Sequence, residues 1–117
     1  MNLRQTFKHA FNGLGFFLRN ESNAWIHSVI SIIVIIAALI FPISLMEWVA
    51  LLLCIGGVFS AEAFNTSIEC LCDLKGREPD PNIKIVKDVS AGAVLIMAII
   101  SVVIGMIIFL PHILEWF

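Results

Sequence analysis

The chain has 117 residues, of which 60% are hydrophobic and only 14% are charged, and its formal net charge is −2 at pH 7. Its mean hydropathy is +1.00. Soluble domains contain about 50% apolar and about 25% charged residues, so the composition excludes an ordinary soluble protein. The small net charge says little about partners, and we expect no nucleic acid among them.

The amino-terminal segment 3–18 has the pattern of an amphipathic helix. Its apolar side chains recur at helical spacing beside a basic and polar stripe; the apolar set is Leu3, Phe7, Phe11 and Leu14, and the polar set is Arg4, Lys8 and Asn12. Such a helix lies on a membrane surface with its basic residues toward the headgroups. No apolar stretch with a cleavage site precedes the first long apolar run, so we expect that run to be retained.

Three apolar runs follow, at about 25–43, 48–73 and 86–110. Each approaches or exceeds the roughly 20 residues that cross a bilayer core. The sequence therefore predicts an all-α integral membrane protein: a surface helix and three transmembrane helices in a single domain, 1–117.

The basic residues are confined to two segments of the chain. All seven precede the first run or lie between the second and third; they are Arg4, Lys8, Arg19, Lys75, Arg77, Lys84 and Lys87. Three spans put both segments on one side of the membrane, and the positive-inside rule makes that side cytoplasmic. We therefore predict a cytoplasmic amino terminus and an external carboxyl terminus.

The second run carries an unusual stripe of polar residues. On a helix, Glu62, Asn65, Glu69 and Asp73 project within roughly 80° of one another, and Glu62 lies about 16 Å from Asp73 toward mid-membrane. These groups could be inert hydrogen-bonding partners between helices. However, three carboxylates on one face repel each other unless a cation lies among them, so we favour a functional site.

Further charged residues are predicted to meet this stripe at the cytoplasmic boundary: Glu21 before the first span, and Lys87 and Asp88 at the start of the third. Clustered carboxylates suit Mg²⁺, which prefers a phosphate as co-ligand, and a lysine can bind phosphate oxygens. Glu62, deeper in a low dielectric, would be a competent general base for an alcohol. The residues thus describe a kinase for a membrane-borne alcohol.

The motif AEAFNTSIECLCD, followed by KIVKDVSAGAVL, resembles the prokaryotic diacylglycerol kinase family, which includes the undecaprenol kinases. FNGL and NESNAWIH are weaker matches upstream. The resemblance covers essentially the whole chain and implies a homotrimeric lipid kinase of the bacterial inner membrane that uses ATP and Mg²⁺. It implies sites shared between protomers and no Walker motif, and none is present.

The resemblance also implies roles for individual residues. Glu62 matches the catalytic base, and Glu21 and Glu69 match the metal ligands. The implied ATP-binding set is Glu21, Asn65, Glu69, Asp73, Glu78, Lys87 and Asp88. Three positions depart from other members: His27 replaces an acid, Asp80 replaces a loop histidine, and Asn2 replaces an arginine.

For the lipid we predict contacts from Glu62, Trp25 and His27. Trp25 is most simply an interfacial anchor that could also line a lipid pocket, and His27 could contact the headgroup. His27 tilts the prediction toward undecaprenol over diacylglycerol as the substrate. A distant alternative is a channel or proton-path subunit with the acidic stripe in a pore, but this leaves Lys87 and Asp88 unexplained.

Overall fold

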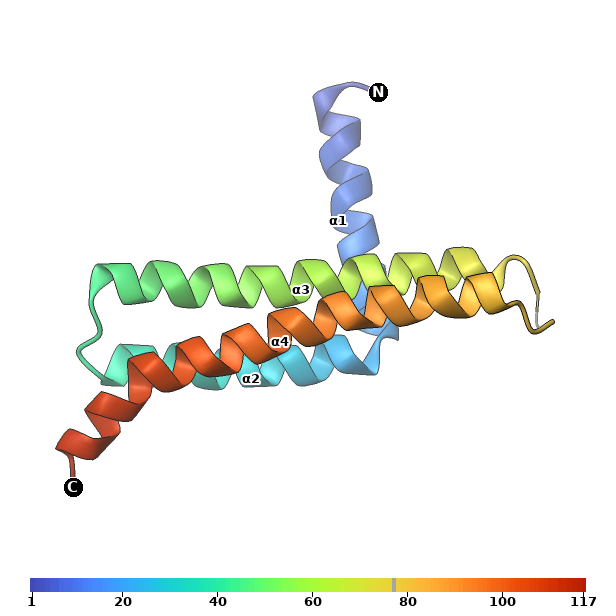
Figure 1. The fold of residues 1–117 in the computed structure, drawn as a ribbon. Coiled ribbons are helices and arrows are strands. Elements are labelled where there is room, and N and C mark those ends of the chain that lie inside the picture. Colours follow the sequence, from blue (N-terminus) through green and yellow to red (C-terminus); the bar gives the residue numbers. More distant parts are fainter. Residues whose placement is uncertain (77) are drawn as a thin grey trace.

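The computed structural model describes residues 1–76 and 78–117, so Arg77, predicted to be one of the cytoplasmic basic residues, lies outside the described residues. The described chain folds into four helices and no strand (Figure 1). These are α1 (Leu3–Asn20), α2 (Ser22–Ile40), α3 (Leu45–Asp73) and α4 (Pro81–Glu115). The predicted all-α fold is confirmed, and α2, α3 and α4 are long and apolar enough to cross a membrane.

Capping groups mark the starts of α1, α3 and α4, and α3 and α4 begin before the predicted apolar runs. Asn2 and Gln5 form a capping box at the start of α1, and Ser44 and Glu47 form another at the start of α3. Asp80 caps α4 by accepting a hydrogen bond from the Asn82 N–H. Each of these side chains satisfies a backbone N–H that would lack a partner in the first turn of a helix.

The predicted end of the third span, near residue 110, falls short of the end of α4. The helix continues through Pro111 to Glu115, and its last turns bend away from the rest of α4 (Figure 1). A proline inside a helix removes one backbone hydrogen bond and kinks the axis, which accounts for a bend without a break. On the same end, Phe41 stacks on His112 at 5.9 Å between ring centroids and meets Trp116 edge-on.

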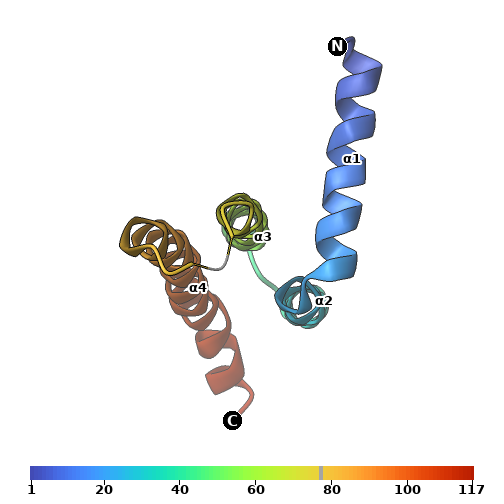
Figure 2. The ribbon, with the colours of Figure 1, turned by 90° about the vertical axis from the view of Figure 1, so that its right-hand side faces the viewer.

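α3 is the central helix of the bundle, with α2 on one side and α4 on the other (Figure 2). Its most extensive packing is against α4. Gly57 permits part of this contact, because a Cβ atom there would collide with the terminal methyl group of Met97. A small residue at a helix interface lets two helices approach closely in lipid.

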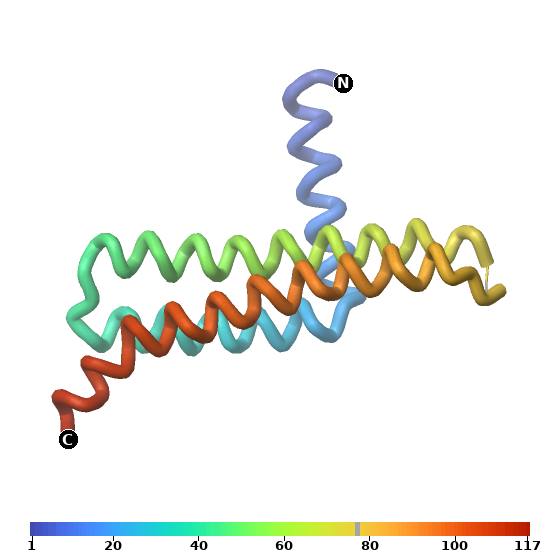
Figure 3. The backbone as a smooth tube through the Cα atoms, in the orientation of Figure 1, coloured from blue at the N-terminus to red at the C-terminus, as the bar shows by residue number. Residues whose placement is uncertain are grey.

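α1 runs across the direction of the three longer helices, as expected of a surface helix (Figure 3). It is anchored at its carboxyl end, where Phe17 is only 5% exposed, whereas Phe7 and Phe11 are exposed. The junction of α1 with α2 and the connection from α3 to α4 lie toward one end of the bundle, and the carboxyl terminus lies at the other.

Candidate functional site

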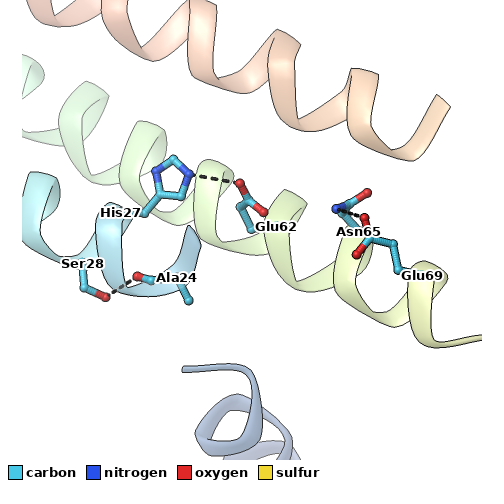
Figure 4. A network of polar contacts seen from close by, with 6 residues as sticks. All are labelled: Ala24, His27, Ser28, Glu62, Asn65 and Glu69. Carbon is cyan, nitrogen blue, oxygen red and sulfur yellow. Dashed lines mark hydrogen bonds and ion pairs between the residues drawn. The ribbon is translucent and has the colours of Figure 1, made fainter. Parts of the chain in front are cut away.

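The polar stripe of α3 lies along the bundle and its deepest member is buried. Glu62 is 5% exposed, and Thr66, one turn later, is 6% exposed. Asn65 and Glu69 are half-buried, and Figure 4 shows them following Glu62 along α3. The carboxylates at 62 and 69 are thus kept off the outer, exposed surface of the helix, as the predicted site requires.

Glu62 is paired with a histidine from α2. The Nε2 atom of His27 lies 3.0 Å from Oε1 of Glu62, a hydrogen-bond distance (Figure 4). The imidazole also meets Phe59 edge-on, with 6.4 Å between ring centroids. This contact joins α2 to α3 through two residues that are 35 positions apart in the chain. The sequence alone did not predict it.

Asn65 and Glu69 form a second polar pair, which begins about one turn nearer the carboxyl end of α3. The Asn65 Nδ2 atom donates a hydrogen bond to Glu69 Oε1 at 3.2 Å. The Asn65 Oδ1 atom is buried and accepts no hydrogen bond from any described residue. A buried acceptor without a partner costs free energy, so an amide oxygen and a carboxylate here suit a hard cation such as Mg²⁺, which prefers oxygen ligands.

The ends of α3 and α4 form a charged cavity of about 620 Å³. Lys87 Nζ donates to Asp73 Oδ1 at 2.8 Å, and Lys84 Nζ donates to Asp88 Oδ2 at 2.6 Å. The cavity lining includes these four side chains and Glu78. Ammonium groups held on an open cavity can exchange their carboxylate partners for phosphate oxygens.

An ion pair joins the two ends of the connection between α3 and α4. Lys75 Nζ donates a hydrogen bond to the Asp80 carboxylate, and this contact is the main reason that the pKa of Asp80 lies below its usual value. The backbone N–H of Asn82 contributes in the same direction. Both interactions favour the charged form, so Asp80 stays ionised while it caps α4.

Comparison with known proteins assigns the chain to a family. Residues 8–109 match the prokaryotic diacylglycerol kinase family. The chain belongs to this family. It is therefore a membrane lipid kinase, and membership implies ATP as the phosphoryl donor.

Two relatives with assigned activities align with most of this kinase. The undecaprenol kinase of Bacillus subtilis is 40% identical over 107 residues, which cover 92% of this chain and 87% of the relative. The diacylglycerol kinase of Synechocystis sp. is 33% identical over 115 residues, which cover 97% of this chain but 66% of the relative. Both names fit the predicted reaction class.

The structure brings only some of the predicted site residues of this kinase together. Four of the predicted ATP ligands, Asp73, Glu78, Lys87 and Asp88, line the charged cavity. The pair Asn65 and Glu69 lies deeper along α3.

The remaining predicted residues lie on or near α2. Glu21 lies between α1 and α2, and its side chain forms no hydrogen bond or ion pair with the rest of the described chain. Within the described residues, no group of three or more His, Cys, Asp or Glu side chains could hold a metal ion. The assignment of Glu21 and Glu69 to one metal therefore stays a prediction, as does lipid contact by Trp25, which is 68% exposed.

Sequence reasoning missed two contributions to the site. Lys84 lines the charged cavity and forms an ion pair with Asp88. The spacing of four residues between them could have predicted this ion pair on a helix. The contact between His27 and Glu62 had no such signal, because it depends on how α2 packs against α3.

Proposed function

We propose that this kinase transfers the γ-phosphoryl group of ATP to undecaprenol, as a homotrimer in the bacterial inner membrane. One observation carries the proposal: a polar stripe on α3 connects a buried carboxylate, Glu62, with a cavity lined by Lys84 and Lys87. The reaction needs this layout, because its acceptor is dissolved in the membrane and its donor in the cytosol.

Glu62 is the group best suited to receive the proton of the alcohol. The lipid oxygen attacks the γ-phosphorus, its proton passes to the Glu62 carboxylate, and the bond from the γ-phosphorus to the leaving oxygen of ADP breaks. Phosphoryl transfer depends mainly on positioning and on electrostatic stabilisation. A buried carboxylate contributes because it receives the proton where water does not compete for it.

The charged cavity suits the nucleotide. Lys87 and Lys84 would offset phosphate charge after release from Asp73 and Asp88, to which they are bound in the free protein. Glu69 and Glu21 would hold Mg²⁺, which when bound neutralises charge on the phosphates. The unpartnered Asn65 Oδ1 atom beside Glu69 supports a cation at this depth.

Undecaprenol is favoured over diacylglycerol as the acceptor. The support is the higher identity with the Bacillus subtilis undecaprenol kinase, 40% against 33% for the Synechocystis diacylglycerol kinase. The test is transfer of radiolabelled phosphate from ATP to each lipid in matched mixed micelles. We expect kcat/KM to be at least about tenfold higher for undecaprenol, equivalent to about 1.4 kcal/mol of differential transition-state binding. A preference for diacylglycerol would overturn the substrate assignment and leave the kinase assignment intact.

Orientation follows from the position of the lysines. Lys75, Lys84 and Lys87 lie at the end of the bundle that carries the connection between α3 and α4, which supports a cytoplasmic location for that end. Cys70 is exposed near this end. In inverted membrane vesicles, where the cytoplasmic face is outermost, a charged maleimide should label Cys70; labelling only in right-side-out vesicles would reverse the orientation.

A further inference from the structure

One polar side-chain contact joins α2 to α3 in the part of the chain that the structure describes. It is the pair formed by His27 Nε2 and Glu62 Oε1, at 3.0 Å (Figure 4). Glu62 is only 5% exposed and has no other hydrogen-bond or ion-pair partner among the described side chains. The histidine is therefore the one described protein group that meets this carboxylate.

The imidazole is held in place from two sides. Phe59, one turn before Glu62 on α3, contacts the ring edge-on. Ala24, one turn before His27 on α2, is completely buried, so α2 is packed against the bundle at this level. A donor held on a packed turn and against an aromatic ring loses little conformational freedom when it forms the hydrogen bond.

Hydrogen-bonding capacity fixes the direction of this bond while Glu62 acts as a base. An ionised carboxylate only accepts hydrogen bonds, so Nε2 of His27 must then carry the proton. The bond engages Oε1, whereas Oε2 has no hydrogen-bond partner among the described residues and is the oxygen better placed to receive the proton of the alcohol.

No other charged side chain forms a hydrogen bond or an ion pair with Glu62 in the described structure. On α3 the next acid is Glu69, about two turns away. Between α1 and α2 lie Arg19 and Glu21, and neither is joined to Glu62 by an ion pair or hydrogen bond in the described structure. On α4 no Asp, Glu, Lys or Arg occurs between Asp88 and Glu115.

We infer that His27 is a positioning residue that holds Glu62 through Oε1 and directs its free oxygen toward the lipid hydroxyl. The inference rests on the proposed function, since it assumes that Glu62 is the base. It replaces direct contact with the lipid headgroup as the main role of His27. Without the histidine, the carboxylate adopts more than one orientation.

Two substitutions of similar polarity separate this role from a structural one. In His27→Gln the amide nitrogen can reach the position of Nε2, whereas in His27→Asn the shorter side chain cannot reach Glu62. We expect His27→Gln to keep kcat within about threefold of wild type, and His27→Asn to lose about 10- to 100-fold, which is less than the roughly 10²- to 10⁴-fold contributed by a catalytic proton transfer itself. KM for ATP should change little in both.

Ser28→Ala is the matched control, because its hydroxyl bonds only to the Ala24 carbonyl at 2.8 Å; kcat should be that of wild type. Equal losses of kcat in His27→Gln and His27→Asn would overturn the inference. A higher KM for the lipid with unchanged kcat would overturn it as well, in favour of headgroup contact. If wild type phosphorylates lipid and Glu62→Gln does not, either result leaves the proposed function standing.

A measurement on the wild-type protein serves if the variants do not fold. In wild type labelled with ¹⁵N-histidine, the Nε2 resonance of His27 should be that of a ring nitrogen hydrogen-bonded to a carboxylate and should move in Glu62→Gln. An Nε2 resonance that is the same in both proteins would overturn the inference.

Discussion

At the scale of single residues, the burial of Glu62 makes a distinct prediction for the chemical step. Glu62→Gln keeps the size of the side chain and removes the base, so turnover should fall by roughly 100-fold or more. The charged cavity that suits the nucleotide is several turns away along α3. Binding of Mg-ATP, followed by fluorescence of a nucleotide analogue, should therefore stay within about twofold of wild type. Glu47→Gln, at the opposite end of α3, is the control, and equal losses of binding and turnover would contradict the assigned role.

Glu69 should affect the metal more than the proton transfer. Glu69→Gln removes the carboxylate that lies beside the unpartnered Asn65 oxygen, so the Mg²⁺ concentration for half-maximal activity should rise about tenfold or more. Titration of activity with Mg²⁺ at saturating ATP measures this. High Mg²⁺ should restore much of the activity in Glu69→Gln but none in Glu62→Gln; a variant insensitive to Mg²⁺ would remove Glu69 from the metal site.

Much of the site could be predicted at this scale, because helical geometry fixes which α3 residues share a face. Glu62, Asn65 and Glu69 follow one another along the helix as expected (Figure 4). The partners from other helices could not be predicted. His27 reaches Glu62 from a different helix, α2, and Lys84 lines a cavity between the end of α3 and the start of α4, so both depend on how the helices pack.

At the scale of helices, the sequence predicted the number and type of elements better than their ends. The apolar runs identify α2, α3 and α4, but Ser44 and Asp80 determine where α3 and α4 begin. Caps depend on single side chains and backbone N–H groups that a hydropathy pattern does not contain. The passage of α4 through Pro111 is a further case, because packing of Phe41 on His112 and Trp116 holds the turns beyond the proline.

The capping box of α3 can be tested apart from catalysis. Ser44→Ala removes the acceptor for the Glu47 N–H and should cost about 1 kcal/mol of stability. The midpoint of thermal unfolding in detergent should fall, while kcat at 25 °C stays within about twofold of wild type because the site is at the other end of α3. Ser44→Asp retains an acceptor and should unfold near the wild-type temperature. An unchanged midpoint in Ser44→Ala would show that packing alone sets this helix end.

At the scale of the whole molecule, a single chain leaves large apolar surfaces uncovered and does not bring all the predicted site residues together. Many large apolar side chains of α2 and α4 are exposed, such as Ile33 at 60% and Ile107 at 67%. Lipid covers some of this surface, and other protomers would cover the rest in the predicted homotrimer. Glu21 has no contact with the Asn65 and Glu69 pair inside the described chain. If Glu21 and Glu69 hold one Mg²⁺, as the resemblance predicts, a neighbouring protomer would have to supply the Glu21.

Mixed assemblies test whether each site is divided between protomers. Glu21→Gln and Glu69→Gln chains, each nearly inactive alone at low Mg²⁺, would be co-expressed with different affinity tags and purified through both. If Glu21 of one protomer serves Glu69 of another, sites with both residues intact form by chance. In a trimer purified through both tags, one of the three sites has both residues intact, so activity should reach about a third of that of wild type. If both residues act within one protomer, every site lacks one of them, and activity should stay at the level of the separate variants.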